Sequence, residues 1–145
     1  MKVRDILRRK RDEIISITAQ VSLLEASRVL SEHNVGVLLV MDAQGKPIGI
    51  ISERDIVRQF AQQGAHCAET PVKEAMTEEL IVGVPDDDLN YVMNVMTQKR
   101  IRHLPILDED RLAGLISIGD VVKAQVDQAE TEIRYLTSYI TGTRT

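Results

Sequence analysis

Apolar and polar residues alternate along the first half of the chain in two patterns that indicate two kinds of element. Apolar runs at residues 14–17, 35–41 and 48–51 are typical of strands, and the run 35–41 has so little polar alternation that we expect it to be buried on both faces. Apolar residues at helical spacing follow Ser22 and Ser52, which predicts helices ending near Asn34 and Gly64. The order is strand, helix, strand, strand, helix.

The second half of the chain repeats this order. We expect strands at 80–84, 101–107 and 112–116, a helix opened by Pro85 and the acidic run 86–88, and a last helix from Val121 to about Ser138. Short helical turns are predicted at 3–7 and 72–76. The segment Gly49-Ile50-Ile51-Ser52-Glu53-Arg54-Asp55 matches Gly114-Leu115-Ile116-Ser117-Ile118-Gly119-Asp120 at a shift of 65 (114 minus 49). Such a repeat indicates two copies of one unit, each marginal alone.

Composition and charge exclude several classes of function. With 43% hydrophobic and 28% charged residues the chain is ordinary for a globular protein, and a net charge of -4 argues against nucleic-acid binding. A single cysteine suits a reducing compartment, and no apolar run is long enough for a signal peptide or a membrane span. We therefore expect a cytoplasmic protein with no nucleic acid and no membrane as partner. The basic run 8–11 is either a solvated helix end or an anion contact.

The two Gly-apolar-apolar-Ser-x-x-Asp stretches, in register with the same order of elements, resemble a tandem pair of cystathionine-β-synthase (CBS) domains, the Bateman module. The segment Arg102-His103-Leu104-Pro105 is similar to the Arg-His-x-Pro segment of that family. The resemblance covers roughly residues 5–127 and extends to stand-alone bacterial members. It implies an α/β (α+β) fold of two units, with CBS domain 1 at 5–63, a linker at 64–71, CBS domain 2 at 72–127 and a helical tail at 128–145.

The resemblance also implies a regulatory module that binds an adenosyl ligand, senses energy or redox state, and acts through a homodimer on an unidentified protein partner. AMP, ADP, ATP, S-adenosylmethionine and NAD(H) are bound within the family, in clefts between paired halves. The alternative is a scaffold without ligand. An enzyme is the least favoured class, since the sequence shows no nucleophile–base pair, and no catalytic residue is predicted. No metal is predicted either, because the histidines and Cys67 lack ligand-like spacing.

The chemistry of the residues at each strand-to-helix junction supports a nucleotide site. An ionised carboxylate can accept hydrogen bonds from both hydroxyls of a ribose, which makes Asp55 and Asp120 the predicted anchors. A serine or aspartate before a helix is otherwise most often an N-cap, and the two roles are compatible. The other candidate ligand contacts are Ser52, Ser117 and Gly119 at the junctions, Arg54, Arg102 and His103 for phosphate, and Ile17, Val37 and Pro105 on the strands.

Two further expectations concern differences along the chain. Gly119 stands where the first copy has Arg54, so the two sites are predicted to differ in charge and therefore in ligand or affinity, and Arg102 is expected to compensate at the second. The apolar residues Ile133, Leu136 and Ile140 of the tail have no partner within the repeat. We expect them to pack against a second chain or to fold back across the module.

Overall fold

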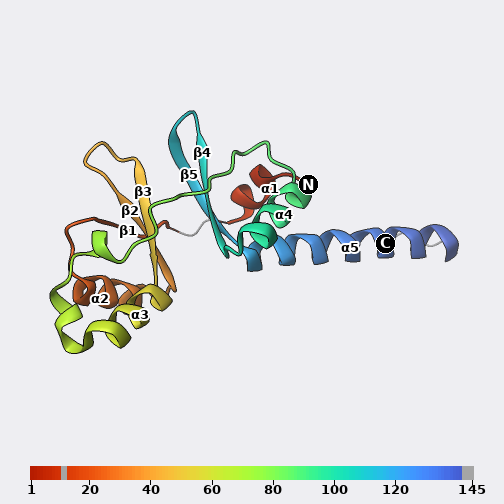
Figure 1. Cartoon of the computed structure of the whole chain (residues 1–145). Coiled ribbons are helices and arrows are strands. Elements are labelled where there is room, and N and C mark those ends of the chain that lie inside the picture. The colour runs from red at the N-terminus through yellow and green to blue at the C-terminus, as the bar shows by residue number, and fades with distance from the viewer. Residues whose placement is uncertain (11–12, 142–145) are drawn as a thin grey trace. The chain divides into compact units, whose positions relative to one another are not determined.

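The computed structural model describes residues 1–10 and 13–141, and these fall into two compact units. The first unit combines residues 1–10, 82–108 and 113–141, and the second combines residues 13–81 and 109–112. The elements are α1 (Val3–Arg9), β1 (Ser16–Thr18), α2 (Leu23–His33), β2 (Val37–Met41), β3 (Pro47–Ser52), α3 (Glu53–Gln63), η1 (Gly64–Glu69), η2 (Val72–Glu74), α4 (Leu89–Lys99), β4 (His103–Asp108), β5 (Arg111–Ser117) and α5 (Ile118–Thr141) (Figure 1). The predicted α/β class is confirmed.

The second unit is a three-stranded sheet packed against helices α2 and α3. The strand order is β1-β2-β3, with β1 parallel to β2 and β2 antiparallel to β3. Strand β2 has the continuous burial that its apolar run predicts, since Val37 to Val40 are all buried. Ser22 caps α2 by accepting a hydrogen bond from Glu25 N at 3.1 Å, and Asn34 ends the helix in the left-handed conformation with φ of 52°. The local signals at both ends of α2 are confirmed.

The first unit holds α4, strand β4 and the long helix α5, together with the N-terminal helix α1. Asp88 caps α4 through a 2.8 Å hydrogen bond from Asn90 N, so the helix begins only at the end of the acidic run, and Pro85, Asp86 and Asp87 precede it instead of forming its first turn. Strand β4 pairs with β5, and α5 packs against both α4 and α1. Leu89, Val92 and Met96 are buried on one face of α4, and Met93 is half-buried beside them.

The strand predicted at residues 80–84 is wrong, because only one parallel bridge forms there, between Gly83 and Ile106. Gly83 N donates to Pro105 O and Leu107 N donates to Gly83 O, each at 2.9 Å. The next rung of a parallel ladder would need an N–H from residue 105, which proline lacks. At the equivalent position of the first copy, Leu39 N donates to Ile15 O at 3.3 Å, and β1 forms beside it. Pro105 therefore ends the ladder.

The N-terminal helix packs with the second repeat rather than with the strands that directly follow it. Val3 N donates to Asp87 O and Arg4 N to Pro85 O, both at 2.9 Å, and Arg4 forms an ion pair with Asp86. The side chain of Leu7 covers Gly114, where an added Cβ would collide with it. The counterpart segment of the first repeat acts in the same way, since Met76 covers Gly49. Each glycine of the repeated motif thus leaves room for an apolar side chain.

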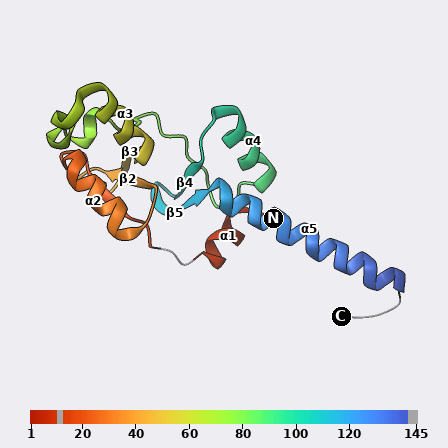
Figure 2. The same cartoon turned by 90° about the horizontal axis from the view of Figure 1, so that it is seen from below.

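Helix α5 runs without interruption from Ile118 to Thr141 and extends well past α1 and α4 of its own unit in both views (Figures 1 and 2). Its buried residues, Val121 and Ala124, lie near its beginning. Ile133, Leu136 and Ile140 are exposed, so the expected fold-back of the tail does not occur in this structure. No helix among the described residues is long and apolar enough to cross a membrane.

Candidate functional site

The two predicted acidic anchors occupy equivalent positions, at the first turn of the helix that follows the repeated strand. In the second unit Ser52 caps α3 by accepting from Asp55 N at 3.2 Å, and Asp55 Oδ2 accepts from Ser52 N at 2.9 Å and from Ser52 Oγ at 3.0 Å. In the first unit Asp120 N donates to Ser117 Oγ at 3.1 Å and Asp120 Oδ2 accepts from Ser117 N at 2.9 Å. Both pairs are reciprocal caps, so the structural role considered for these residues exists.

Capping uses one oxygen of each carboxylate. Among residues 1–10 and 13–141, no hydrogen bond is found to Oδ1 of Asp55 or of Asp120. A carboxylate offers about four acceptor positions over its two oxygens, so each side chain retains the capacity to accept further donors. The pair of ribose hydroxyls is one group that could supply them.

Lys10, whose role the sequence left undecided, lies at the site of the first unit. Lys10 Nζ lies 2.8 Å from Asp120 Oδ2 and donates to Leu115 O at 2.9 Å. Its side chain is 25% exposed and that of Asp120 is 27% exposed, so the ion pair is largely withdrawn from water. Lys10 belongs to the basic run for which a solvated helix end and an anion contact were both considered. The structure instead places it on a carboxylate 110 residues away.

The charges around Asp120 act on its pKa in opposite directions. Burial raises the pKa of Asp120, but the hydrogen bond and charge of Lys10 and the hydrogen bond from Ser117 N outweigh it, and the net pKa lies below its ordinary value. The carboxylate is therefore ionised at neutral pH. It can act as an acceptor for hydroxyl donors throughout the physiological range.

His103, predicted as a phosphate contact, lies in the same electrostatic environment. Burial lowers its pKa most, the charges of Lys10 and Arg102 lower it further, and the charge of Asp120 opposes them. The net pKa lies below the ordinary value of a histidine, which favours the neutral imidazole at pH 7. Arg102 itself is exposed, and its carbonyl accepts from Ile118 N at 2.8 Å, which holds the start of β4 beside the start of α5. Lys10, Arg102, His103 and Asp120 thus form one cluster.

The second unit offers a different set of charges around Asp55. Arg54 is exposed on the first turn of α3, next to the exposed Glu53. By the repeat, Gly36 and Val37 take the places of Arg102 and His103 (102 minus 36 is 66, as is 103 minus 37), so this unit lacks the two basic residues on its strand. Val37 is paired with Ser52 and is buried. The sequence prediction that the two sites differ in charge is consistent with this placement.

The remaining candidates are dispersed. Ile17 pairs with Val40 and packs against the core of the second unit, Pro105 is buried in β4, and Gly119 is exposed on the first turn of α5. The binding roles predicted for them stay predictions. No group of three or more His, Cys, Asp or Glu residues suited to a metal ion is found among the described residues.

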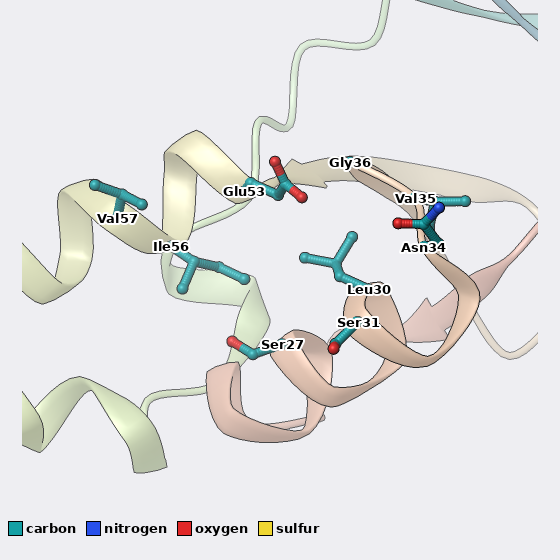
Figure 3. A pocket seen from close by; sticks show the side chains of 9 residues that line it. All are labelled: Ser27, Leu30, Ser31, Asn34, Val35, Gly36, Glu53, Ile56 and Val57. Atoms are coloured by element: carbon teal, nitrogen blue, oxygen red, sulfur yellow. The ribbon is translucent and has the colours of Figure 1, made fainter.

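A separate open cavity of about 590 Å³ lies between α2 and α3 of the second unit (Figure 3). Ser27, Leu30 and Ser31 line one side, and Glu53, Ile56 and Val57 line the other. It contains none of the predicted ligand residues, although Glu53 and Gly36 adjoin Ser52 and Val37. Its lining contains no basic residue, whereas the Asp120 cluster contains Lys10 and Arg102.

Comparison with known proteins gives consistent results. The CBS domain family matches residues 3–62 and 72–127. The mitochondrial CBS domain-containing protein CBSX3 of Arabidopsis thaliana is 38% identical over 129 residues, which cover 86% of this chain but 63% of the plant protein. The CBS-domain protein ATU1752 of Agrobacterium tumefaciens is 40% identical with a TM-score of 0.82, covering 86% of this chain and 99% of that one. The CBS domain pair of MJ0100, solved with 5'-methylthioadenosine and S-adenosyl-L-methionine, is 27% identical with a TM-score of 0.77, covering 88% and 98%.

Proposed function

Because the chain belongs to the CBS-domain family, as a tandem pair of CBS domains, we propose that it is a regulatory module that binds an adenosyl ligand and has no catalytic activity of its own. The observation that carries the proposal is the matched placement of Asp55 and Asp120, each with one carboxylate oxygen used by a cap and one available to ribose. The ligands bound to MJ0100 both contain an adenosine unit, which supports this choice of ligand class.

The charges favour a phosphorylated ligand at Asp120, such as AMP, ATP or NAD(H). Lys10 contacts this carboxylate, and the charges of Lys10, Arg102 and Asp120 all act on His103; phosphate groups are bound through such donors. The first turn of α3 carries the exposed Arg54 and the exposed Glu53, whose charges oppose each other, so a ligand without phosphate, such as S-adenosylmethionine, fits the second unit better. The protein would then respond to energy or redox state at one site, as a homodimer that acts on a protein partner.

A ligand would change the contacts of the cap only if it binds the arrangement with those contacts and the arrangement without them with different affinities. The ammonium group of Lys10 has three N–H donors, and two of its acceptors are Asp120 Oδ2 and Leu115 O. A ligand phosphate that attracts Lys10 Nζ would compete with Asp120 Oδ2 for these donors. Lys10 directly follows α1. A change in its contact with Asp120 would therefore transmit the effect of ligand binding to α1 and the rest of the first unit.

A second candidate function is a scaffold that binds no nucleotide. The observation that favours it is the reciprocal cap itself, because Asp55 and Asp120 already have structural partners. Isothermal titration calorimetry separates the two functions. The scaffold predicts no heat of binding with AMP, ATP, NADH or S-adenosylmethionine.

The decisive variants are Asp120→Asn and Asp55→Asn, which remove the charge and leave an oxygen for the cap. Losing charge-assisted hydrogen bonds of about 1.5–3 kcal/mol weakens binding roughly ten- to hundredfold at the altered site. Asp108→Asn is the matched control, since this carboxylate stands at the end of β4 and outside the cluster. Equal affinities in the parent and in both site variants would refute the ribose assignment.

A further inference from the structure

An apolar stripe follows α5 along its whole free length. Its members recur alternately at three and four residues and are Val122, Val126, Ala129, Ile133, Leu136 and Ile140. All are exposed, and Ile133 remains 64% exposed. At about 100° per residue the members of this α5 stripe stay within about 40° of one line along the helix. The repeat of seven residues is the pattern by which one helix packs along another.

The contacts of α5 within its own unit leave the α5 stripe uncovered. Val121 and Ala124, the buried residues of this helix, lie about 100° or more around its surface from the centre line of the stripe. The body of the unit therefore packs on another side of α5. The matched CBS-domain residues end at 127, so Ala129, Ile133, Leu136 and Ile140 form an extension beyond the two matched domains.

We propose that the α5 stripe is the interface of a parallel, two-stranded coiled coil formed with α5 of a second copy of this chain. Val126, Ile133 and Ile140 take the a positions of the heptad, and Val122, Ala129 and Leu136 take the d positions. β-Branched residues at a favour two parallel strands. This inference deepens the dimeric part of the proposed function by naming its surface, and it does not depend on which ligand binds.

The flanking charges distinguish the two possible orientations. In a parallel, in-register pair, residues at g face residues at e five positions later on the other helix, which sets Gln125 against Glu130 and Glu132 against Thr137. Neither pairing opposes like charges. In the antiparallel pair that keeps the whole stripe in contact, Glu130 lies opposite Glu130 of the second copy, and Glu132 lies opposite Glu132 of the second copy. That orientation opposes two sets of like charges and is disfavoured.

The test compares two adjacent residues of which one belongs to the stripe. Leu136→Glu places a charge in the interface, whereas Tyr135→Glu places the same charge one residue earlier, at a 70% exposed position about 100° from it. In sedimentation equilibrium of the full chain we expect a dimer for the parent and for Tyr135→Glu. Leu136→Glu should weaken dimerisation at least about a hundredfold, since two leucines leave the interface. A monomeric parent, or the same dimer strength in both variants, would overturn the proposal.

Orientation is tested with Ala129→Cys. A parallel pair brings the two d-position cysteines together, and mild oxidation should give a covalent dimer on a non-reducing gel. The antiparallel pair sets residue 129 against residue 133, so the absence of a covalent dimer overturns the parallel arrangement. The parent is the control, because its Cys67 is buried. Calorimetry of Leu136→Glu with the adenosyl ligands keeps the two proposals apart, because failure of dimerisation and failure of ligand binding appear in different measurements.

Discussion

The ion pair between Lys10 and Asp120 should contribute measurably to the stability of the first unit. Its atoms are 2.8 Å apart, and the two side chains are 25% and 27% exposed. Exposed pairs contribute about 0.2–1 kcal/mol, whereas loss of one partner of a buried pair costs about 3–5 kcal/mol. The partial burial of this pair lies between these limits, so we expect a coupling free energy of about 1–2 kcal/mol.

A double-mutant cycle measures this coupling. Lys10→Met keeps the aliphatic part of the side chain, Asp120→Asn keeps an oxygen for the cap on Ser117, and the double variant completes the cycle. Urea unfolding is followed by far-UV circular dichroism, because the chain contains no tryptophan. Each substitution should lower the free energy of unfolding more when it is made in the parent than when it is made in a chain that already carries the other substitution. The difference between the two losses is the coupling free energy.

An exposed pair on α2 provides the matched control. Arg28 and Glu25 approach to 3.5 Å with side chains 62% and 54% exposed, so the cycle of Arg28→Met and Glu25→Gln should give about 0.3 kcal/mol or less. If the coupling of Lys10 with Asp120 is no larger than that of the control, the reasoning from burial is refuted.

The coupling should also depend on pH. The folded-state pKa of Asp120 lies below its ordinary value of 3.8, so the unfolded chain binds its proton more readily than the folded one. The stabilisation is therefore complete above 3.8 and is lost as the pH falls through the lower folded-state pKa. The same cycle at neutral pH and at a pH below 3.8 should show a smaller coupling at the acidic value. An unchanged coupling would mean that protonation of this carboxylate is not involved.

Two further predictions concern residues around the cluster. Gly114→Ala should destabilise the protein by about 1–3 kcal/mol in urea unfolding, because the new Cβ collides with Leu7, whereas Gly36→Ala, with its nearest neighbour at 3.8 Å, should be tolerated. AMP at saturation should raise the pKa of His103 above its lowered value in an NMR titration, because a nearby phosphate favours the imidazolium form. An unshifted titration would contradict the phosphate contact.

Sequence patterns predicted those features of the chain that depend on neighbours along it. The helix after Ser22 begins where its cap indicates, and Asn34 ends it, because capping joins residues two to four positions apart. The internal repeat predicted two equivalent junctions, and the structure places Asp55 and Asp120 in the same cap geometry. The charge difference between the two junctions was also visible from residues 54 and 119.

The strand predicted at 80–84 shows where local pattern was insufficient. Its residues are apolar enough for a strand, but a strand exists only if a neighbour supplies hydrogen bonds. Pro105, more than twenty residues later, cannot supply the next one. The sequence does contain the difference responsible, since Leu39 and Pro105 stand at equivalent positions of the two repeats. Its effect on the strand can be predicted only when the register of the hydrogen-bonded ladder is known.

The sequence by itself determined the caps of α2 and α3 and the apolar stripe of α5, because each is specified by residues within about one heptad of each other. Tertiary structure alone decided that α1 packs with the second repeat, that Leu7 covers Gly114 and that Lys10 reaches Asp120. Lengthening a loop adds little to the entropy cost of closing it, so sequence distance restricts such partners only weakly. Shape and charge complementarity select them, and these exist only once the chain has folded.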